Sequence, residues 1–259
     1  MRRLYEICPG VLVATANLYV TNTTAVTGPD GGCLLIDPAV TAAELRLLAA
    51  DLAGRGLVPR AGFATHAHWD HVLWCAELGA APRLASAKTA AAAQRNLAAM
   101  TAAVRDEAPG HDLALFGQLT ALGRDQDTIE WAGQDARVLV HDGHAPGHSA
   151  VWLPGSGVLV AGDMCSDIEI PLLDLTGADP VGDYRAGLEL FAGLTGVRLV
   201  IPGHGSPGDA AALRTRLTAD FRYLDALEAG RDFGDSRLGA AWLRAAHDRQ
   251  LRHMRGRLS

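Results

Sequence analysis

The first third of the chain alternates short apolar runs with turn residues, which is the pattern of β-strands in a sheet. The turn between two of these runs is marked by Pro29-Asp30-Gly31-Gly32, a cluster of residues that favours chain reversal. From these runs the sequence predicts strands over residues 11–14, 18–23, 33–36 and 61–65.

Between the third and fourth of these runs lies a segment whose apolar residues have helical spacing. Leu45, Leu48 and Leu52 recur at spacings of three and four residues, so residues 42–53 are predicted to form an amphipathic helix. Residues 72–78 have the same character. Ser86, whose hydroxyl can accept a hydrogen bond from the first helical turn, is a suitable N-cap for an alanine-rich helix after it.

The second half of the chain repeats this order of strands followed by helices. Strands are predicted over residues 128–131, 137–141, 150–153, 158–161 and 198–201, and helices over 184–194, 209–229 and 238–254. Two batches of strands, each followed by helices, favour two sheets packed face to face with helices on both outer surfaces. The expected fold class is α/β, a four-layer αββα sandwich of two mixed β-sheets.

The chain is predicted to form a single domain over residues 1–259, because no segment rich in Pro, Gly or Ser separates its halves. A helical insertion is expected at about 86–116, and C-terminal helices at about 209–255. The alanine, leucine and methionine stripe of the insertion has two readings. It either packs on the sandwich or covers a cleft as a lid that selects the substrate.

Composition narrows the class of partner. The 259 residues are 49% hydrophobic and carry a formal charge of −6, which gives no electrostatic attraction to nucleic acid or to an anionic membrane. Four cysteines lie far apart without a CxxC pair, as is usual in a reducing compartment. The basic start lacks a cleavage site, and Lys88 and Arg95 interrupt the longest apolar stretch. We expect a cytoplasmic protein with a small-molecule substrate, and leave monomer and homodimer open.

The highest density of potential metal ligands is found in the segment Thr65-His66-Ala67-His68-Trp69-Asp70-His71. His66 and His68 are two residues apart on an extended chain, so they project to the same side and can share one metal ion. Asp70 and His71 follow where the chain turns, and can face a second ion. Imidazole and carboxylate are ligands that zinc accepts.

This motif resembles the signature of the metallo-β-lactamase superfamily, and further matching motifs follow in the order that the family shows. They are Asp37 after an early strand, His148 in Ala145-Pro146-Gly147-His148-Ser149, Asp163 in Val160-Ala161-Gly162-Asp163, and His204 in Pro202-Gly203-His204-Gly205. The resemblance implies two metal ions, with zinc expected and iron or manganese as alternatives.

The resemblance also implies a role for each residue. It assigns His66, His68 and His148 to the first ion, and Asp70, His71 and His204 to the second. Asp163 would bridge the ions, and Asp37 would support a ligand imidazole from behind. Asp70 would in addition transfer a proton during catalysis. Trp69, within the motif, and His144, four residues before His148, are candidates for contact with the substrate.

The implied activity is that of a dinuclear hydrolase, in which two ions activate a bridging water to cleave an ester, thioester or lactone. The same fold also supports phosphodiesterase and β-lactamase activity. Asp163 stands where true β-lactamases of the family usually carry cysteine or serine, which argues against that subclass. An alternative from another enzyme class is an oxidoreductase, a persulfide dioxygenase with a single iron. A third alternative is a binding protein whose former active site is no longer catalytic.

Overall fold

Side chains along the strands alternate between two different cores, and this alternation builds the layers. In β2 (Val11–Thr15), Val11 and Val13 contact the opposite sheet, whereas Leu12 and Ala14 face helices. The same division holds in β10 (Val158–Gly162), where Val158 lies between the sheets and Leu159 packs against helices. Because successive side chains of a strand point to opposite faces, both faces of each sheet must be covered.

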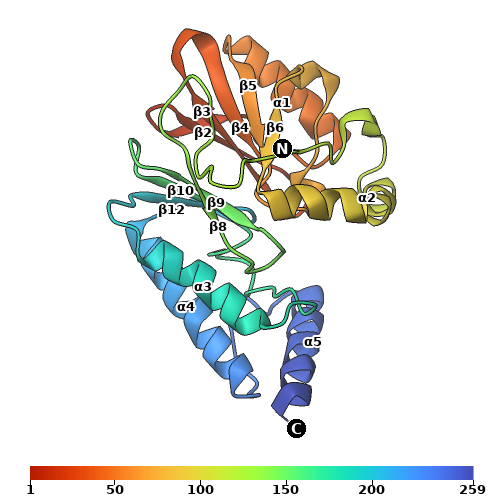
Figure 1. Ribbon diagram of the computed structural model, residues 1–259, viewed down its shortest axis with the longest axis vertical. Coiled ribbons are helices and arrows are strands. Elements are labelled where there is room, and N and C mark those ends of the chain that lie inside the picture. The colour runs from red at the N-terminus through yellow and green to blue at the C-terminus, as the bar shows by residue number, and fades with distance from the viewer. Residues whose placement is uncertain (259) are drawn as a thin grey trace.

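The computed structural model describes residues 1–258, which form the four layers seen in Figure 1. Within these residues one sheet has seven strands in the order β1 to β7, and a second has five in the order β12-β11-β10-β9-β8. Both combine parallel and antiparallel neighbours. The prediction of an αββα sandwich of two mixed sheets is therefore confirmed.

The first sheet contains β1 (Tyr5–Cys8), β2, β3 (Asn22–Thr27), β4 (Gly32–Ile36), β5 (Val58–Phe63), β6 (Arg83–Ala85) and β7 (Thr120–Ala121). The second contains β8 (Arg137–Val140), β9 (Ser149–Leu153), β10, β11 (Leu199–Pro202) and β12 (Gly208–Asp209). Helices α1 (Ala42–Gly54) and α2 (Ala87–Glu107) cover the first sheet, and α3 (Pro180–Ala192), α4 (Ala210–Glu228) and α5 (Ala241–Leu258) cover the second (Figure 1).

Three local predictions differ from the structure. The strand expected over 18–23 begins only at Asn22, because Tyr19 and Val20 have positive φ angles of 58° and 56° and form a tight turn. Residues 72–78 are not an α-helix: they follow the 3-10 turn η2 (Trp69–His71) and end in a second such turn, η3 (Ala76–Leu78). At 128–131 the structure has a single bridge between Thr128 and Arg137 instead of a strand.

The segment expected as a helical insertion contains α2 and the short turn η4 (Leu113–Leu115). Most of its apolar stripe is buried, since Ala93, Met100 and Val104 share one core with the leucines of α1, whereas Leu97 is exposed. This packing favours the structural reading of the segment over the lid. None of the helices among the described residues combines the length and the apolarity that crossing a membrane requires.

Candidate metal centre

The residues predicted to bind metal converge on one edge of the sandwich. Asp37 directly follows β4, and the segment His66–His71 follows β5, which runs parallel to β4. Asp163 follows β10, and His204 follows the parallel strand β11. Because the carboxyl ends of parallel strands meet at the same edge, side chains far apart in the sequence come together there.

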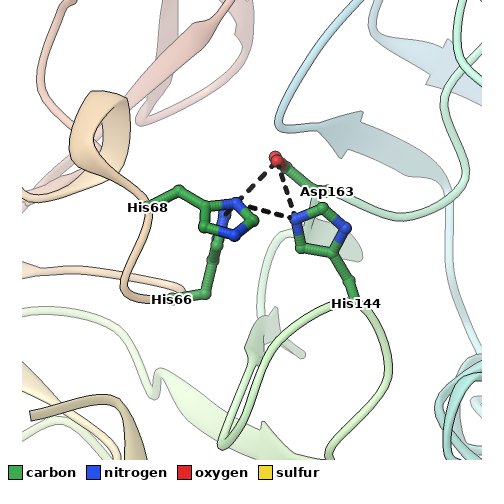
Figure 2. A group of neighbouring side chains, drawn as sticks. All are labelled: His66, His68, His144 and Asp163. Atoms are coloured by element: carbon green, nitrogen blue, oxygen red, sulfur yellow. Dashed lines mark hydrogen bonds and ion pairs between the residues drawn. The ribbon is translucent and has the colours of Figure 1, made fainter. Parts of the chain in front are cut away.

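The first group of donors consists of His66, His68, His144 and Asp163 (Figure 2). Nδ1 of His68 lies 2.9 Å from Nε2 of His66 and 3.0 Å from Nε2 of His144. Oδ2 of Asp163 lies 3.3 Å from Nε2 of both His66 and His144. One donor atom from each side chain therefore points to the same small volume, and His68 is the solvent-exposed member.

The second group of donors consists of Asp70, His71 and His204. Nε2 of His71 lies 3.4 Å from both Oδ2 of Asp70 and Nε2 of His204. The two oxygens of Asp163 reach this group as well, since Oδ1 lies 3.2 Å from Nε2 of His71 and Oδ2 lies 3.2 Å from Nε2 of His204. Asp163 thus stands between the two groups.

Hydrogen bonds on the far side of the His144 and His204 rings fix which ring nitrogen faces the centre. Nδ1 of His144 donates to the carbonyl of Leu172 at 2.9 Å, and Nδ1 of His204 donates to the carbonyl of Tyr19 at 2.9 Å. A neutral imidazole that donates from Nδ1 keeps a lone pair on Nε2. In their neutral form, these two rings therefore have Nε2 available for a cation.

Asp37 performs the same task for two neighbouring side chains. Its Oδ2 accepts hydrogen bonds from Nδ1 of His71 at 2.9 Å and from the hydroxyl of Thr65 at 2.7 Å. Thr65 Oγ1 in turn lies 3.0 Å from Nδ1 of His66. One buried carboxylate therefore orients an imidazole of each group, which is how outer carboxylates stabilise metal ligands.

The donor set fits divalent cations. Oδ1 of Asp163 is buried and has no hydrogen-bond partner among the described residues, which is costly for a carboxylate oxygen unless a cation compensates it. Ring nitrogens of three histidines also converge at 2.9 and 3.0 Å, an arrangement that a shared cation would stabilise. Three to four imidazole and carboxylate donors per group match the ligand number of zinc and related metals.

Charges within the centre shift its pKa values in opposite directions. Burial disfavours the charged ring of His204, but the carboxylates of Asp163 and Asp70 outweigh burial and raise its pKa to about 9. Burial lowers the pKa of His66 well below its usual value. Although burial opposes ionisation of Asp163, the neighbouring histidines His204, His71 and His66 keep its pKa well below the usual range. The carboxylate is ionised and ready to bind a cation.

One expected ligand differs from the structure. The resemblance assigns His148 to the first ion, but the structure groups His144, and not His148, with His66, His68 and Asp163. Nε2 of His148 accepts a hydrogen bond from the backbone amide of Asp163 at 3.0 Å, and Nδ1 lies 3.2 Å from Nε2 of His141. Both ring nitrogens are thus engaged with protein atoms, and the buried ring supports the loop that carries Asp163.

An aromatic pair borders the second group. The ring of Tyr19 lies 6.0 Å from that of Trp69 in an edge-to-face contact and 6.4 Å from that of His204. Trp69 is half-buried, and Tyr19 keeps 40% of its surface exposed. Sequence reasoning missed Tyr19 because it placed this residue inside a strand. The consecutive positive φ angles that turn it toward the centre leave no clear mark in the sequence.

Glycines permit the close approach of the loops. A Cβ atom at Gly203 would overlap Oδ1 of Asp163, and one at Gly162 would overlap the ring of His148. Gly162 also has a positive φ of 56°, which favours glycine. The flanking glycines of the motifs are therefore required by the packing of the centre.

Comparison with known proteins places the chain in a family. A sequence profile described as the Metallo-beta-lactamase superfamily matches residues 16–231. A metallo-beta-lactamase family protein from Thermus thermophilus has a similar structure, with a TM-score of 0.70, 23% identity, and coverage of 96% of this chain and 93% of that one. A beta-lactamase domain protein from Burkholderia ambifaria gives a TM-score of 0.65 at 21% identity, covering 88% and 76%.

A third similar structure is the stereoselective inverting sec-alkylsulfatase from a Pseudomonas species, with a TM-score of 0.72 and 18% identity. The match covers 99% of this chain and 50% of that one. No curated protein sequence matches the chain. The structural matches establish the fold, and the sequence profile covers most of the 259 residues, including every residue of both donor groups. The chain therefore belongs to the metallo-beta-lactamase superfamily.

Proposed function

We propose that this protein is a dinuclear metal-dependent hydrolase that cleaves the ester, thioester or lactone bond of a small, largely uncharged molecule. The observation that carries the proposal is the pair of adjacent donor groups on either side of Asp163, whose ring nitrogens are preset by hydrogen bonds behind them. Zinc is the expected metal, and the nitrogen and oxygen donors are also compatible with iron or manganese.

Two bound divalent ions would supply a water of lowered pKa and a Lewis acid for the carbonyl oxygen of the substrate. The chain provides their ligands in two sets. His66, His68 and His144 would hold one ion, Asp70, His71 and His204 the other, and Asp163 would bridge them. Burial opposes ionisation of Asp70, but His71 and His204 keep its pKa below the usual range. Asp70 is therefore ionised and suited to bind metal, and we propose that it also takes part in proton transfer.

The surroundings of the centre support an uncharged substrate. The strongest charge effects on the pKa values of Asp70, Asp163 and His204 come from histidines and carboxylates. Bound metal ions can offset part of the charge of a phosphodiester, but sites for such substrates commonly add Arg or Lys side chains. The exposed ring of Tyr19, backed by Trp69, instead offers an apolar wall for an acyl or aryl group.

The test combines metal content with a substrate panel. Protein purified without added metal is analysed for bound metals, then loaded with zinc, iron or manganese and assayed. The panel contains p-nitrophenyl butyrate, a butyryl thioester, a γ-lactone, an alkyl sulfate and bis-p-nitrophenyl phosphate. We expect about two zinc ions per chain and the highest kcat/KM on a carbonyl substrate. His66→Ala should abolish turnover, whereas His111→Ala, a histidine bonded to the carbonyl of Val40 outside the centre, should not.

Other outcomes would replace this proposal. About one iron per chain, with oxygen consumed on glutathione persulfide, would indicate a dioxygenase. The highest kcat/KM on the phosphodiester or on the alkyl sulfate would indicate a different ester class. A protein that neither retains metal nor turns over any substrate would be a binding protein with a spent site.

A further inference from the structure

The loop that carries the Leu172 carbonyl is held by a side chain from α5. Residues 169–173 belong to no helix or strand, so the hydrogen bonds of a regular element do not fix their backbone. Gln250, a buried residue of α5, reaches this loop with both ends of its amide. Its Oε1 accepts from the N–H of Leu173 at 2.6 Å, and its Nε2 donates to the carbonyl of Pro171 at 3.0 Å. One side chain therefore fixes the backbone on both sides of Leu172.

Gln250 and His144 hold opposite sides of one peptide unit. The carbonyl of Leu172 and the N–H of Leu173 belong to the same trans peptide, and in such a planar unit the two groups point in opposite directions. Gln250 binds the N–H, while Nδ1 of His144 donates to the carbonyl at 2.9 Å. The orientation of this peptide unit therefore decides whether a proton acceptor faces Nδ1 of His144.

The amide of Gln250 is fixed in one orientation. A peptide N–H can only donate and a carbonyl can only accept, so its partners in the loop require an oxygen at one end and a nitrogen at the other. The second proton of Nε2 goes to the hydroxyl of Tyr223 at 2.8 Å. That hydroxyl donates to Nδ1 of His247 at 2.9 Å, and Nε2 of His247 donates to Oδ1 of Asp232 at 3.0 Å. A buried network in which each donor has an acceptor holds a single geometry.

We propose that Gln250 is a positioning residue for the metal centre. By orienting the carbonyl of Leu172, it keeps the proton of the neutral His144 ring on Nδ1 and leaves Nε2 free for a cation. Nε2 of His144 lies 3.3 Å from Oδ2 of Asp163, so this free nitrogen faces the first group of donors. A helix outside both donor groups thus supports a ligand through the backbone of a loop, which is the part that outer partners take in metal sites. The inference rests on the metal centre of the proposed function and not on the choice of substrate.

The first test measures the affinity for zinc. Gln250→Met keeps the length of the side chain and removes both hydrogen bonds to the loop. We expect one of the two zinc ions to bind about 10- to 100-fold more weakly, which is typical for the loss of an outer partner of a ligand. The affinity for the other ion should change by less than about twofold. Titration of metal-free protein with zinc against a competing chelator measures both values.

The second test observes the tautomer of His144 in metal-free protein and needs neither metal nor activity. Nitrogen NMR shifts distinguish a protonated from an unprotonated ring nitrogen, and the signals of His144 are those that His144→Ala lacks. The wild-type ring should carry its proton on Nδ1, and Gln250→Met should lose this preference. Gln250→Glu, whose carboxyl can still accept from the N–H of Leu173, should keep the proton on Nδ1 and recover part of the zinc affinity.

Leu251→Ala provides the matched control in the same helix. Leu251 is buried in the core over the second sheet, and its apolar side chain can make no hydrogen bond to the loop. The variant should unfold at a lower urea concentration, with zinc affinity and the His144 tautomer unchanged.

Two results would overturn the inference while leaving the metal centre and the hydrolase intact. One is an equal loss of zinc affinity in Leu251→Ala and Gln250→Met. The other is a Gln250→Met protein with the zinc affinity and the His144 tautomer of the wild type. If the wild-type protein binds neither zinc, iron nor manganese, the proposed function fails and the inference fails with it.

Discussion

His144 and His148 stand four residues apart in one loop, yet the atoms around their rings differ. Nε2 of His144 lies 3.0 Å from Nδ1 of His68, among the metal donors. Nε2 of His148 accepts the amide proton of Asp163 at 3.0 Å. A lone pair that already accepts a hydrogen bond in a buried site binds metal only if that bond breaks and leaves the amide unpaired. At the residue scale, the direction of one hydrogen bond thus separates a ligand from a supporting residue.

This distinction predicts different effects of two alanine substitutions. His144→Ala should weaken binding of one of the two metal ions by more than about 100-fold, because it removes a direct donor. His148→Ala should weaken metal binding by about 10-fold or less and lower the free energy of unfolding by about 1–3 kcal/mol, since the Asp163 amide loses its partner. Titration of zinc against a competing chelator measures the first effect and urea unfolding the second.

His148→Gln, whose side-chain oxygen can accept the amide proton, is the control and should recover part of the lost stability. The assignment would be reversed if His148→Ala lost one metal ion while His144→Ala kept both.

At the scale of elements, the N-terminus of α2 fastens the loop that carries His144. The hydroxyls of Ser86 and Thr89 both donate to the carbonyl of Gly147, at 2.6 and 2.8 Å. Ser86 is also the N-cap of α2, because its Oγ accepts from the amide of Thr89 at 3.1 Å. Since α2 packs through its apolar face into the core over the first sheet, the loop is anchored to a rigid helix.

Ser86→Ala should therefore affect both the fold and the centre. Loss of the cap should lower the free energy of unfolding by about 0.5–2 kcal/mol. Loosening the loop should also weaken metal binding by up to about 10-fold, because His144 loses part of its support. Thermal unfolding and chelator competition measure the two effects on the same preparation.

Thr41→Ala is the matched control. Thr41 caps α1, its hydroxyl accepting from the amide of Glu44 at 3.2 Å, but it does not bond to the loop of His144. It should cost similar stability and leave metal affinity unchanged. Equal effects of the two variants on metal affinity would remove the proposed link between α2 and the centre.

At the scale of the whole molecule, both sheets of the sandwich contribute side chains to the centre. At some of these side chains a proton and a metal ion compete for the same atom. His204, from the second sheet, has its pKa raised to about 9 although burial opposes it, because Asp163 and Asp70 favour the charged ring. In the metal-free protein, this shift contributes stability that is fully present below the unfolded pKa of about 6.5. That stability is lost as the pH rises through about 9.

Metal binding should show the opposite dependence on pH. A protonated His204 cannot bind a cation, so metal affinity should rise as the pH increases toward about 9. At pH 7.5, calorimetric titration of zinc into metal-free protein in two buffers of different ionisation enthalpy should reveal proton release. The variant His204→Ala should release about one proton fewer per chain. Affinity that stays constant between pH 6 and 9 would contradict this account.

Much of this protein follows from patterns that are local in the sequence. Short apolar runs such as residues 11–14 predicted strands, and the spacing of the leucines in 42–53 predicted α1, because the pattern of apolar residues in an element reflects which of its faces are buried. The segment His66–His71 predicted donors for two ions, because neighbours on an extended chain that then turns must face nearby points. These features need no knowledge of distant residues.

Other features depend on contacts between segments far apart in the chain. From the sequence, His148 rather than His144 was assigned to the first ion, because the groups that distinguish the two rings, the carbonyl of Leu172 and the amide of Asp163, belong to other loops. The sequence by itself determined the fold class and the kinds of donor. Only the tertiary structure decided which lone pairs are free, because that depends on hydrogen bonds between segments that folding brings together.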